Sequence, residues 1–268
     1  MRVEQNGLKM TEPSHNPMDV LFHPRWPVFY ADNHLLVLYK PAGLRMQRDH
    51  TGKANLSDLA KAWIKVRYDK PGQVFLGIVH RLDAPVAGLI ALARTSKGAA
   101  RLSAQFRDGI IRKRYLAVVS GRPPHDSDRL VHHIERSGRL SRLVPAAGPH
   151  SQEARLSYQL LEHRPPLSLI QVDLETGRRH QIRLQLAALG CPILGDRSYG
   201  AQQALPDGRI ALLAARLSLM HPTRGEPLHF SLPEPGGWPW PAESAPLRPL
   251  WSLEDYQRAG WRMPGDSG

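Results

Sequence analysis

Short apolar runs of strand length recur along the middle of the chain, and turn residues separate them. Runs of this length, bounded by Gly, Pro, Asn or Asp, are typical of buried or half-buried strands. The last two runs enclose a short turn and therefore predict a hairpin. The runs occupy residues 34–39, 74–79, 89–92, 110–120, 130–134, 154–161, 167–174, 210–219 and 228–232.

Three other segments show a helical period. Asn55 is a suitable N-cap for a helix that continues to about residue 67, and Asp58 stands in its first turn. Thr95 predicts the start of a second helix, which Gly109 ends. A third helix ends at Gly190. Strands at irregular spacing, mixed with helices, predict an α+β domain.

Composition divides the chain into three parts. Residues 1–26 are polar and rich in Pro, which indicates an N-terminal arm. Residues 27–235 carry the strands and helices and form the expected catalytic domain, with a basic insertion or hairpin at 121–153. Residues 236–268 form a tail rich in Pro and Trp. We expect its tryptophans to dock on the domain surface; the alternative is a proline-rich partner motif.

The overall composition is that of a globular, soluble protein. The chain has 268 residues, of which 41% are hydrophobic, and no apolar run has the length needed to cross a bilayer. The N-terminus lacks the apolar segment of a secretory signal. Cys191 is the single cysteine, so no intrachain disulfide can form. These features predict a cytoplasmic protein without a membrane segment.

A strong positive charge points to a polyanionic partner. The formal net charge is +12, and most of the cations are arginines, whose planar forks bind phosphate. Nucleic acid is the expected partner, although a codon bias toward Arg would give the same composition. His132 and His133 are adjacent but lack a second pair of ligands at metal spacing, so we expect no metal site.

The clearest candidate chemistry lies between the runs at 74–79 and 89–92. His80, Arg81 and Asp83 stand where a buried strand opens into a turn. An ionised Asp at such a place needs a partner or water, and catalytic groups are often held on loops by rigid strands. The alternative is that Asp83 only caps a turn and that the two basic side chains are solvated.

A second polar cluster follows residue 174. Arg179 and Arg183 are four residues apart near the start of the third helix, where cations oppose the helix dipole. They need an anion, which a phosphate or Asp83 would supply, unless both are simply solvated. In the run 110–120, alternation places Lys113 and Tyr115 on one face of the strand.

Four motifs stand in a fixed order. They are YKPAGL at 39–44, HRLD at 80–83, KRYLA at 113–117, and TGRRHQIR at 176–183, which continues to PILGD at 192–196 and YG at 199–200. With these motifs the chain resembles the RluA family of pseudouridine synthases, over roughly residues 30–235. A hairpin near His221 fits the same family.

The resemblance implies a fold and a reaction. The fold is a mixed, largely antiparallel sheet with surrounding helices and an RNA cleft. The reaction isomerises specific uridines in ribosomal RNA or tRNA to pseudouridine, without cofactor or metal, after the base has left its stack. By resemblance, Asp83 is the nucleophile or the base, and Tyr115 packs on the uracil. A guanidinium favours the ionised carboxylate, and we assign this role to Arg183.

The resemblance also implies the RNA contacts. Arg81 would fill the gap left by the flipped nucleotide. Further phosphate or active-site contacts are expected from His80, Lys40, Lys113, Arg178 and His180. The residues ahead of the catalytic domain are too few for the S4-type domain of many relatives, which favours an RNA stem-loop as the target. A monomer is the default expectation.

Two departures from the family pattern motivate an alternative. Val86 and Ala87 stand where Thr-Ser is usual, and Arg179 stands where Thr is usual. The missing hydroxyls suggest a catalytically silent RNA-binding relative, whereas the presence of Asp83 and Tyr115 argues against it. A protein kinase is excluded because no Gly-rich phosphate loop and no DFG motif accompany the HRLD string.

Overall fold

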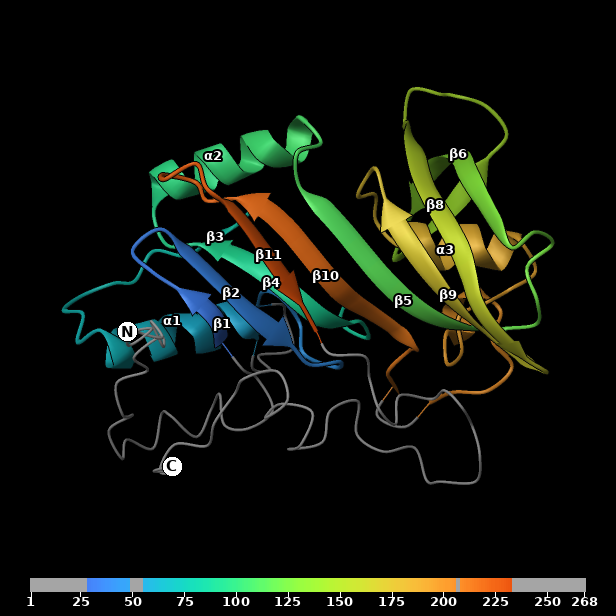
Figure 1. Cartoon of the computed structure of the whole chain (residues 1–268), viewed down its shortest axis with the longest axis horizontal. Helices are drawn as coiled ribbons and strands as arrows, with labels where there is room; N and C mark the ends of the chain where they lie inside the picture. The colour runs from blue at the N-terminus through green and yellow to red at the C-terminus, as the bar shows by residue number, and fades with distance from the viewer. Residues whose placement is uncertain (1–27, 49–54, 206–207, 233–268) are drawn as a thin grey trace, which may run out of the picture.

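The computed structural model describes residues 28–48, 55–205 and 208–232 (Figure 1). The expected arm at 1–26 and the tail at 236–268 lie outside these residues. Among the described helices, none is long and apolar enough to cross a membrane.

The described strands form one eleven-stranded sheet, which is antiparallel except where β4 and β10 pair. Along the main path the order is β1-β2-β4-β10-β5-β9-β8-β6-β7, with β3 on β4 and β11 on β10. This arrangement confirms the largely antiparallel α+β fold. The strands are β1 (Val28–Ala31), β2 (Leu35–Lys40), β3 (Gly77–Ile78), β4 (Ala87–Ala93), β5 (Arg112–Ser120), β6 (Ser127–Ser137), β7 (Leu140–Val144), β8 (Ser151–Arg164), β9 (Leu167–Leu174), β10 (Leu212–Met220) and β11 (Pro227–Ser231).

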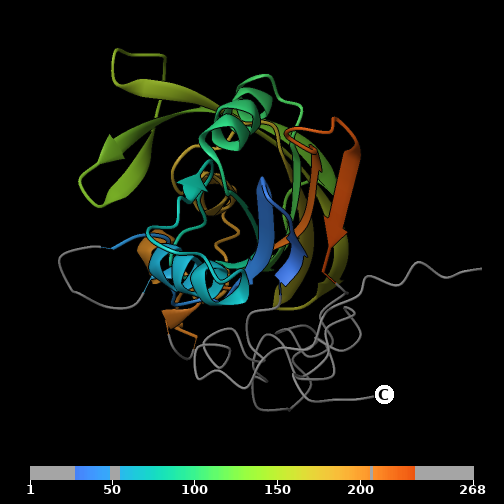
Figure 2. The ribbon, with the colours of Figure 1, turned by 90° about the vertical axis from the view of Figure 1, so that its left-hand side faces the viewer.

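Three helices accompany the sheet, and Figure 2 shows α1 and α2 on the same side of it. They are α1 (Leu56–Arg67), α2 (Ser96–Arg107) and α3 (Gln181–Ala188). Both predicted N-caps are confirmed. The side chain of Asn55 accepts a hydrogen bond from the Asp58 N–H at 3.0 Å, and that of Thr95 accepts from the Gly98 N–H at 3.0 Å. Each bond satisfies one of the free N–H groups at a helix start.

The centre of the sheet is buried and, apart from Lys40 at the end of β2, apolar. Every residue of β2 and β4 is buried, as their continuous apolar runs predict for strands covered on both faces. Gly88 of β4 has φ +131°, and a Cβ there would lie 2.5 Å from the backbone N and O of Ala214 on β10. Only glycine therefore permits β4 and β10 to approach this closely at the start of β4.

The predicted strand at 74–79 is wrong in extent, because only Gly77–Ile78 pairs as β3. The reason lies in its neighbours: β2 occupies one edge of β4, and β10 occupies the start of the other edge at Ala87 and Gly88. Further along this edge the Ala91 N–H donates to the His80 ring, and β3 pairs with Leu92 and Ala93. The insertion predicted at 121–153 is confirmed as a hairpin of β6 and β7, which curls toward the helix side of the sheet (Figure 2).

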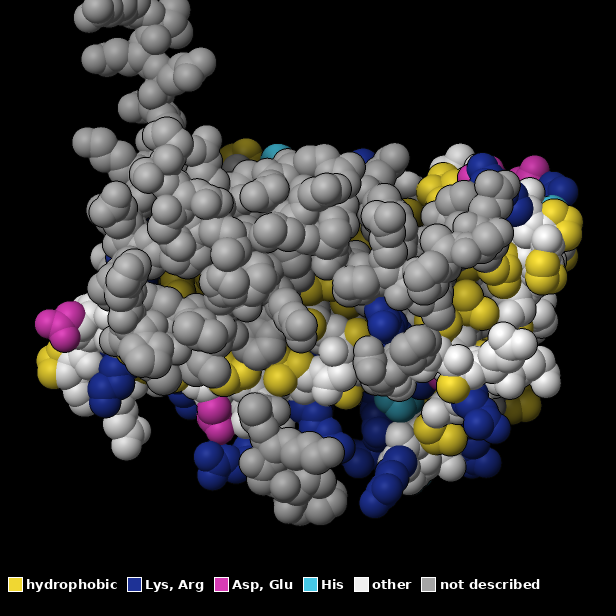
Figure 3. Space-filling model, turned by 90° about the horizontal axis from the view of Figure 1, so that it is seen from below, with side chains coloured by type: hydrophobic (Ala, Val, Ile, Leu, Met, Phe, Trp, Pro, Cys, Tyr) yellow, Lys and Arg dark blue, Asp and Glu magenta, His cyan; other side chains and the backbone are white. Residues whose placement is uncertain are grey.

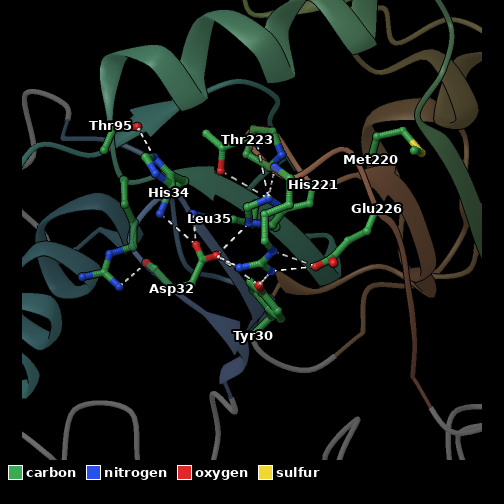
Figure 4. A network of polar contacts seen from close by, with 12 residues as sticks. Tyr30, Asp32, His34, Leu35, Thr95, Met220, His221, Thr223 and Glu226 are labelled. Atoms are coloured by element: carbon green, nitrogen blue, oxygen red, sulfur yellow. Dashed lines mark hydrogen bonds and ion pairs between the residues drawn. The ribbon is translucent and has the colours of Figure 1, made fainter.

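A polar network joins the β1–β2 turn to the β10–β11 turn (Figure 4). Asp32 accepts hydrogen bonds from the backbone N–H groups of His34 and Leu35, both at 2.8 Å. Its other oxygen lies 2.7 Å from Nε2 of His221, which is fully buried, and 2.9 Å from Nη1 of Arg224. Because Nδ1 of His221 accepts from the Arg224 N–H at 3.0 Å, this ring is a neutral donor to Asp32. The His221 motif thus holds two distant turns together.

Candidate active site

Asp83 lies in the tight turn between β3 and β4. Its backbone C=O accepts from the Val86 N–H at 3.0 Å, and the C=O of the next residue, Ala84, accepts from the Gly43 N–H at 2.7 Å. These bonds fasten the turn to the loop that follows β2. The Asp83 side chain remains 29% exposed. A carboxylate is therefore presented to solvent on a rigid base, which is the arrangement expected of a catalytic group.

Arg183 of α3 binds this carboxylate, as predicted. Its Nη1 lies 3.2 Å from Oδ2 of Asp83. The opposite edge of the guanidinium forms a bidentate pair with Asp196, at 2.6 Å from Nε and 2.8 Å from Nη2. Burial opposes the charged form, but the two carboxylates outweigh it and raise the pKa of Arg183. A charged and fixed guanidinium thus stands beside the Asp83 carboxylate.

Asp196 was not predicted as a site residue, although it ends the PILGD segment. Its side chain is only 2% exposed, and it precedes the short 3-10 helix η2 (Arg197–Tyr199). Because Asp196 binds one edge of the Arg183 guanidinium, the other edge of that guanidinium is free to face Asp83. The PILGD motif at 192–196 contains Asp196, but the motif alone does not indicate which cation this carboxylate binds.

Lys40 does not lie on the surface, where the expected RNA contact would require it. The side chain is fully buried at the end of β2, and Nζ donates to the carbonyls of Pro41, Leu44 and Ala84 at 2.9, 2.8 and 3.2 Å. Burial lowers its pKa to about 7, against the opposing effect of Asp83. With no exposed surface it cannot touch RNA. It joins the loop after β2 to the turn that carries Asp83.

The expected RNA contact at His80 is also corrected. The ring turns into the fold, where Nε2 accepts from the Ala91 N–H at 2.9 Å and the ring centroid lies 4.8 Å from that of Phe106. Burial, with a smaller effect of Lys113, lowers its pKa to about 3. His80 is therefore a neutral structural residue that links the β3–β4 turn to β4 and α2.

Tyr115 lies in the middle of β5, opposite Val172 of β9 and Ala214 of β10. It is only 6% exposed. Burial raises the pKa of its phenol above the ordinary range, and the charge of Asp83 raises it further. The residue therefore remains a neutral phenol beside the carboxylate. Its neighbour Arg114 pairs with Asp173 at 2.7 Å, in keeping with the predicted alternation of faces.

Three further predicted cations lie along the same region. Lys113 is half-buried, with Nζ 5.7 Å from the Phe106 ring centroid. Burial and, to a smaller extent, the charge of Arg178 lower its pKa to about 8. Arg178 is exposed and donates from Nε to the carbonyl of Glu153 at 2.9 Å. Arg81 is exposed in the turn that carries Asp83. An incoming phosphate would relieve the repulsion between Lys113 and Arg178.

His180 completes the surroundings of Asp83. Its Nε2 lies 3.7 Å from Oδ2 of the carboxylate, and its Nδ1 lies 2.8 Å from the hydroxyl of Tyr199. Burial lowers the pKa of His180, although Asp83 acts in the opposite direction. The backbone of His180 is left-handed, with φ +58°, directly before α3. Tyr199 belongs to the quoted YG pair but was not predicted as a site residue.

The prediction that Arg179 lies on the third helix with Arg183 is wrong. Because α3 begins only at Gln181, Arg179 precedes the helix. Its guanidinium instead donates to the carbonyls of Gly138 and Arg139 at the tip of the β6–β7 hairpin. The cation at this departure from the family pattern therefore connects the site to the hairpin.

The other departure has a packing explanation. Val86 is 3% exposed and Ala87 is fully buried, so both side chains face the core. The site contacts of Asp83 do not involve either side chain. The structure therefore gives no reason to expect that the loss of two hydroxyls changes the position of the carboxylate.

Comparison with known proteins identifies the family. Residues 34–188 match the RNA pseudouridylate synthase family. Ribosomal large subunit pseudouridine synthase D of Zymomonas mobilis is 31% identical over 85% of this chain and 74% of its own length. An uncharacterized RNA pseudouridine synthase of Chloroflexus aurantiacus is 42% identical over 61% of this chain, which spans about half (52%) of that relative.

Solved structures show the same fold. The human RNA Pseudouridylate Synthase Domain Containing 4 superposes with a TM-score of 0.66 at 24% identity, over 80% of this chain and 89% of that chain. The human Domain Containing 1 protein gives a TM-score of 0.61 over 78% of this chain. The match over residues 34–188 and the Zymomonas relative show that the chain belongs to the RNA pseudouridylate synthase family, whose members are isomerases.

Proposed function

We propose that this chain converts specific uridines in ribosomal RNA or tRNA to pseudouridine, with Asp83 as the reacting carboxylate. The proposal is supported by the contacts of Arg183 with two carboxylates. The buried Asp196 orients the guanidinium of Arg183 toward the partly exposed carboxylate of Asp83. Ribosomal RNA is the first substrate to test, because relatives named ribosomal large subunit pseudouridine synthases D and C are 35% and 34% identical to this chain over 66% and 61% of their own length.

The proposed reaction balances within one nucleotide. The bond between N1 and C1′ breaks, the uracil rotates, and a new bond joins C5 to C1′ while C5 loses its proton and N1 gains one. Asp83 acts either by attack on the ribose or by removal of a proton, and both roles need the ionised form that Arg183 favours. Because the reaction is an isomerisation, it needs no oxidant or reductant.

The base must reach Asp83 outside its stack. The ring of Tyr115 would pack on the flipped uracil, and the exposed side chain of Arg81 would occupy the gap left in the RNA. Lys113 and Arg178 would hold phosphates. Lys and Arg side chains gather along one edge of the face in Figure 3, where acidic side chains are fewer. This charge would supply a salt-sensitive, sequence-independent part of the affinity.

The test uses RNA from a strain without this gene, with uridines labelled with tritium at C5. Formation of pseudouridine releases the label, and carbodiimide-dependent primer stops map the sites. We expect the wild-type protein to release tritium at discrete sites and Asp83→Asn to release none. If both proteins bind the RNA and neither releases tritium, the catalytically silent RNA-binding relative is the correct interpretation.

A further inference from the structure

One phenol touches three parts of the site. The hydroxyl of Tyr199 lies 2.8 Å from Nδ1 of His180 and accepts from the Ser141 N–H of β7 at 3.0 Å. The same oxygen lies 3.3 Å from the Ser141 carbonyl. The face of its ring lies under the guanidinium of Arg183, 4.9 Å from the ring centroid. Tyr199 therefore contacts both His180 and Arg183, the two side chains that face Asp83.

The position of the hydrogens follows from these contacts. A phenol has one hydrogen to donate, and its shorter acceptor contact is the one to His180. If the hydroxyl donates to Nδ1, a neutral His180 carries its own hydrogen on Nε2, which faces Asp83 at 3.7 Å. The opposite arrangement would point an imidazole lone pair at the carboxylate, and two lone pairs repel each other.

The same contact reaches the hairpin of β6 and β7. Ser141 is buried in β7, just after the tip of the hairpin, while Arg179 binds the carbonyls of Gly138 and Arg139 in that tip. The guanidinium of Arg179, the residue before His180, and the hydroxyl of Tyr199 thus contact the same hairpin. A shift of β7 would be transmitted to His180 through the hydroxyl of Tyr199.

We infer that Tyr199 is a positioning residue: its hydroxyl holds His180 in the form that carries its hydrogen on Nε2, directs that hydrogen to Asp83, and links this geometry to the β6–β7 hairpin. The inference rests on the proposed function in one respect, because it takes Asp83 as the reacting carboxylate. Tyr199 acts through His180 and Arg183 and needs no contact with the uracil.

The first measurement concerns the imidazole itself and requires no RNA. In protein with ¹⁵N-labelled histidine, long-range ¹⁵N–¹H spectra distinguish the two neutral tautomers. The signal that disappears in His180→Asn is that of His180, and Asn tolerates its left-handed backbone. We expect the wild type to carry the hydrogen on Nε2 and Tyr199→Phe to show a mixture. Protonation of Nδ1 in the wild type would overturn the inference.

The second measurement is the single-turnover rate on labelled RNA. Tyr199→Phe keeps the ring under Arg183 and removes only the hydroxyl, and we expect a rate about tenfold lower with little change in KM. Tyr158→Phe is the matched control, since its hydroxyl donates to the His125 carbonyl at 3.1 Å away from the site. We expect this variant to keep the wild-type rate.

A double-mutant cycle separates positioning from general damage. In a His180→Asn background, Tyr199→Phe should have no further effect on the rate, because its route to Asp83 is already absent. An equal loss in both backgrounds, or no loss in either, contradicts the inference. If the wild type releases tritium from no RNA, the proposed function fails, whereas the tautomer spectra still decide the role of Tyr199.

Discussion

Nη1 of Arg183 lies 3.2 Å from Oδ2 of Asp83, while Asp196 holds the other edge of the same guanidinium at 2.6 and 2.8 Å. The planar fork of arginine can bind one carboxylate by two parallel hydrogen bonds and still reach a second carboxylate, whereas the ammonium of a lysine offers no bidentate edge. The Asp83 carboxylate is therefore held by a residue 100 positions further along the chain.

Arg183→Lys should lower the single-turnover rate about 100-fold, because the charge remains but the bidentate contact is lost. Arg114→Lys is the matched control. Arg114 also forms a bidentate pair, with Asp173 at 2.7 and 3.0 Å, but on the other face of β5. A wild-type rate for Arg183→Lys would show that only the positive charge matters.

Asp196→Asn should lower the free energy of unfolding by about 3 kcal/mol, because the buried guanidinium then loses its charged partner. Urea denaturation measures the change. Asp173→Asn is the control, since its pair lies near the surface with 47% of the side chain exposed, and it should cost less than about 1 kcal/mol. Equal losses in the two variants would contradict a special role for Asp196.

Asp32 should make stability dependent on pH in the acid range. Burial alone would raise its pKa, but hydrogen bonds from the His34 and Leu35 N–H groups and from His221 outweigh burial and lower the pKa to about 2. The stabilisation, about 2 kcal/mol, is complete above pH 5 and is lost as the pH falls toward 2, where the folded carboxylate also takes a proton.

Urea denaturation of the wild type and of Asp32→Asn between pH 2 and pH 7 tests this prediction. The variant should be less stable at pH 7, and its stability should change less between pH 5 and pH 2. Asp108→Asn changes an exposed carboxylate and should follow the wild-type curve. Parallel curves for Asp32→Asn and the wild type would contradict the assignment.

Gly88→Ala should destabilise the protein by about 3 kcal/mol, because the new Cβ would meet the backbone of Ala214 at 2.5 Å in a left-handed conformation. Gly138→Ala provides the matched comparison. It also has positive φ, +55°, but open space around the Cβ, so we expect a loss of about 1 kcal/mol. Thermal or urea unfolding distinguishes the close approach from the backbone effect.

RNA affinity should fall as the pH rises through about 8, where burial and Arg178 place the pKa of Lys113. Above that value the free lysine is neutral and cannot attract a phosphate. Lys113→Arg keeps the charge and should make the affinity less dependent on pH, whereas Lys97→Arg, on the exposed side of α2, should not. The measurement is the RNA affinity of the wild type and of both variants between pH 6.5 and pH 9.5. The same pH dependence for Lys113→Arg and the wild type would contradict the prediction.

The sequence could predict features that depend on neighbouring residues. The N-caps Asn55 and Thr95 follow from local hydrogen bonding, and both are present. For Arg183 the local pattern left a phosphate, Asp83 or solvent as partners, and the assignment to Asp83, which the structure shows, drew on the family resemblance. Local hydrogen bonding was sufficient for the two caps.

The direction of a side chain depends on long-range packing and could not be predicted. Lys40 and His80 stand in motifs beside Asp83, but the structure turns both inward onto backbone groups. Asp196 and Tyr199 stand in a quoted motif, but their contacts with Arg183 and His180 exist only once η2 lies against α3. Spacing along the chain cannot reveal such contacts.

The central claim is that Asp83 is the reacting carboxylate of an RNA uridine isomerase. The most direct test compares tritium release from C5-labelled RNA by the wild type, Asp83→Asn and Asp173→Asn, with RNA affinity measured for each. We predict release by the wild type and by Asp173→Asn, none by Asp83→Asn, and similar affinity for all three. Tritium release by Asp83→Asn at the wild-type rate would contradict the role of Asp83 as the reacting carboxylate.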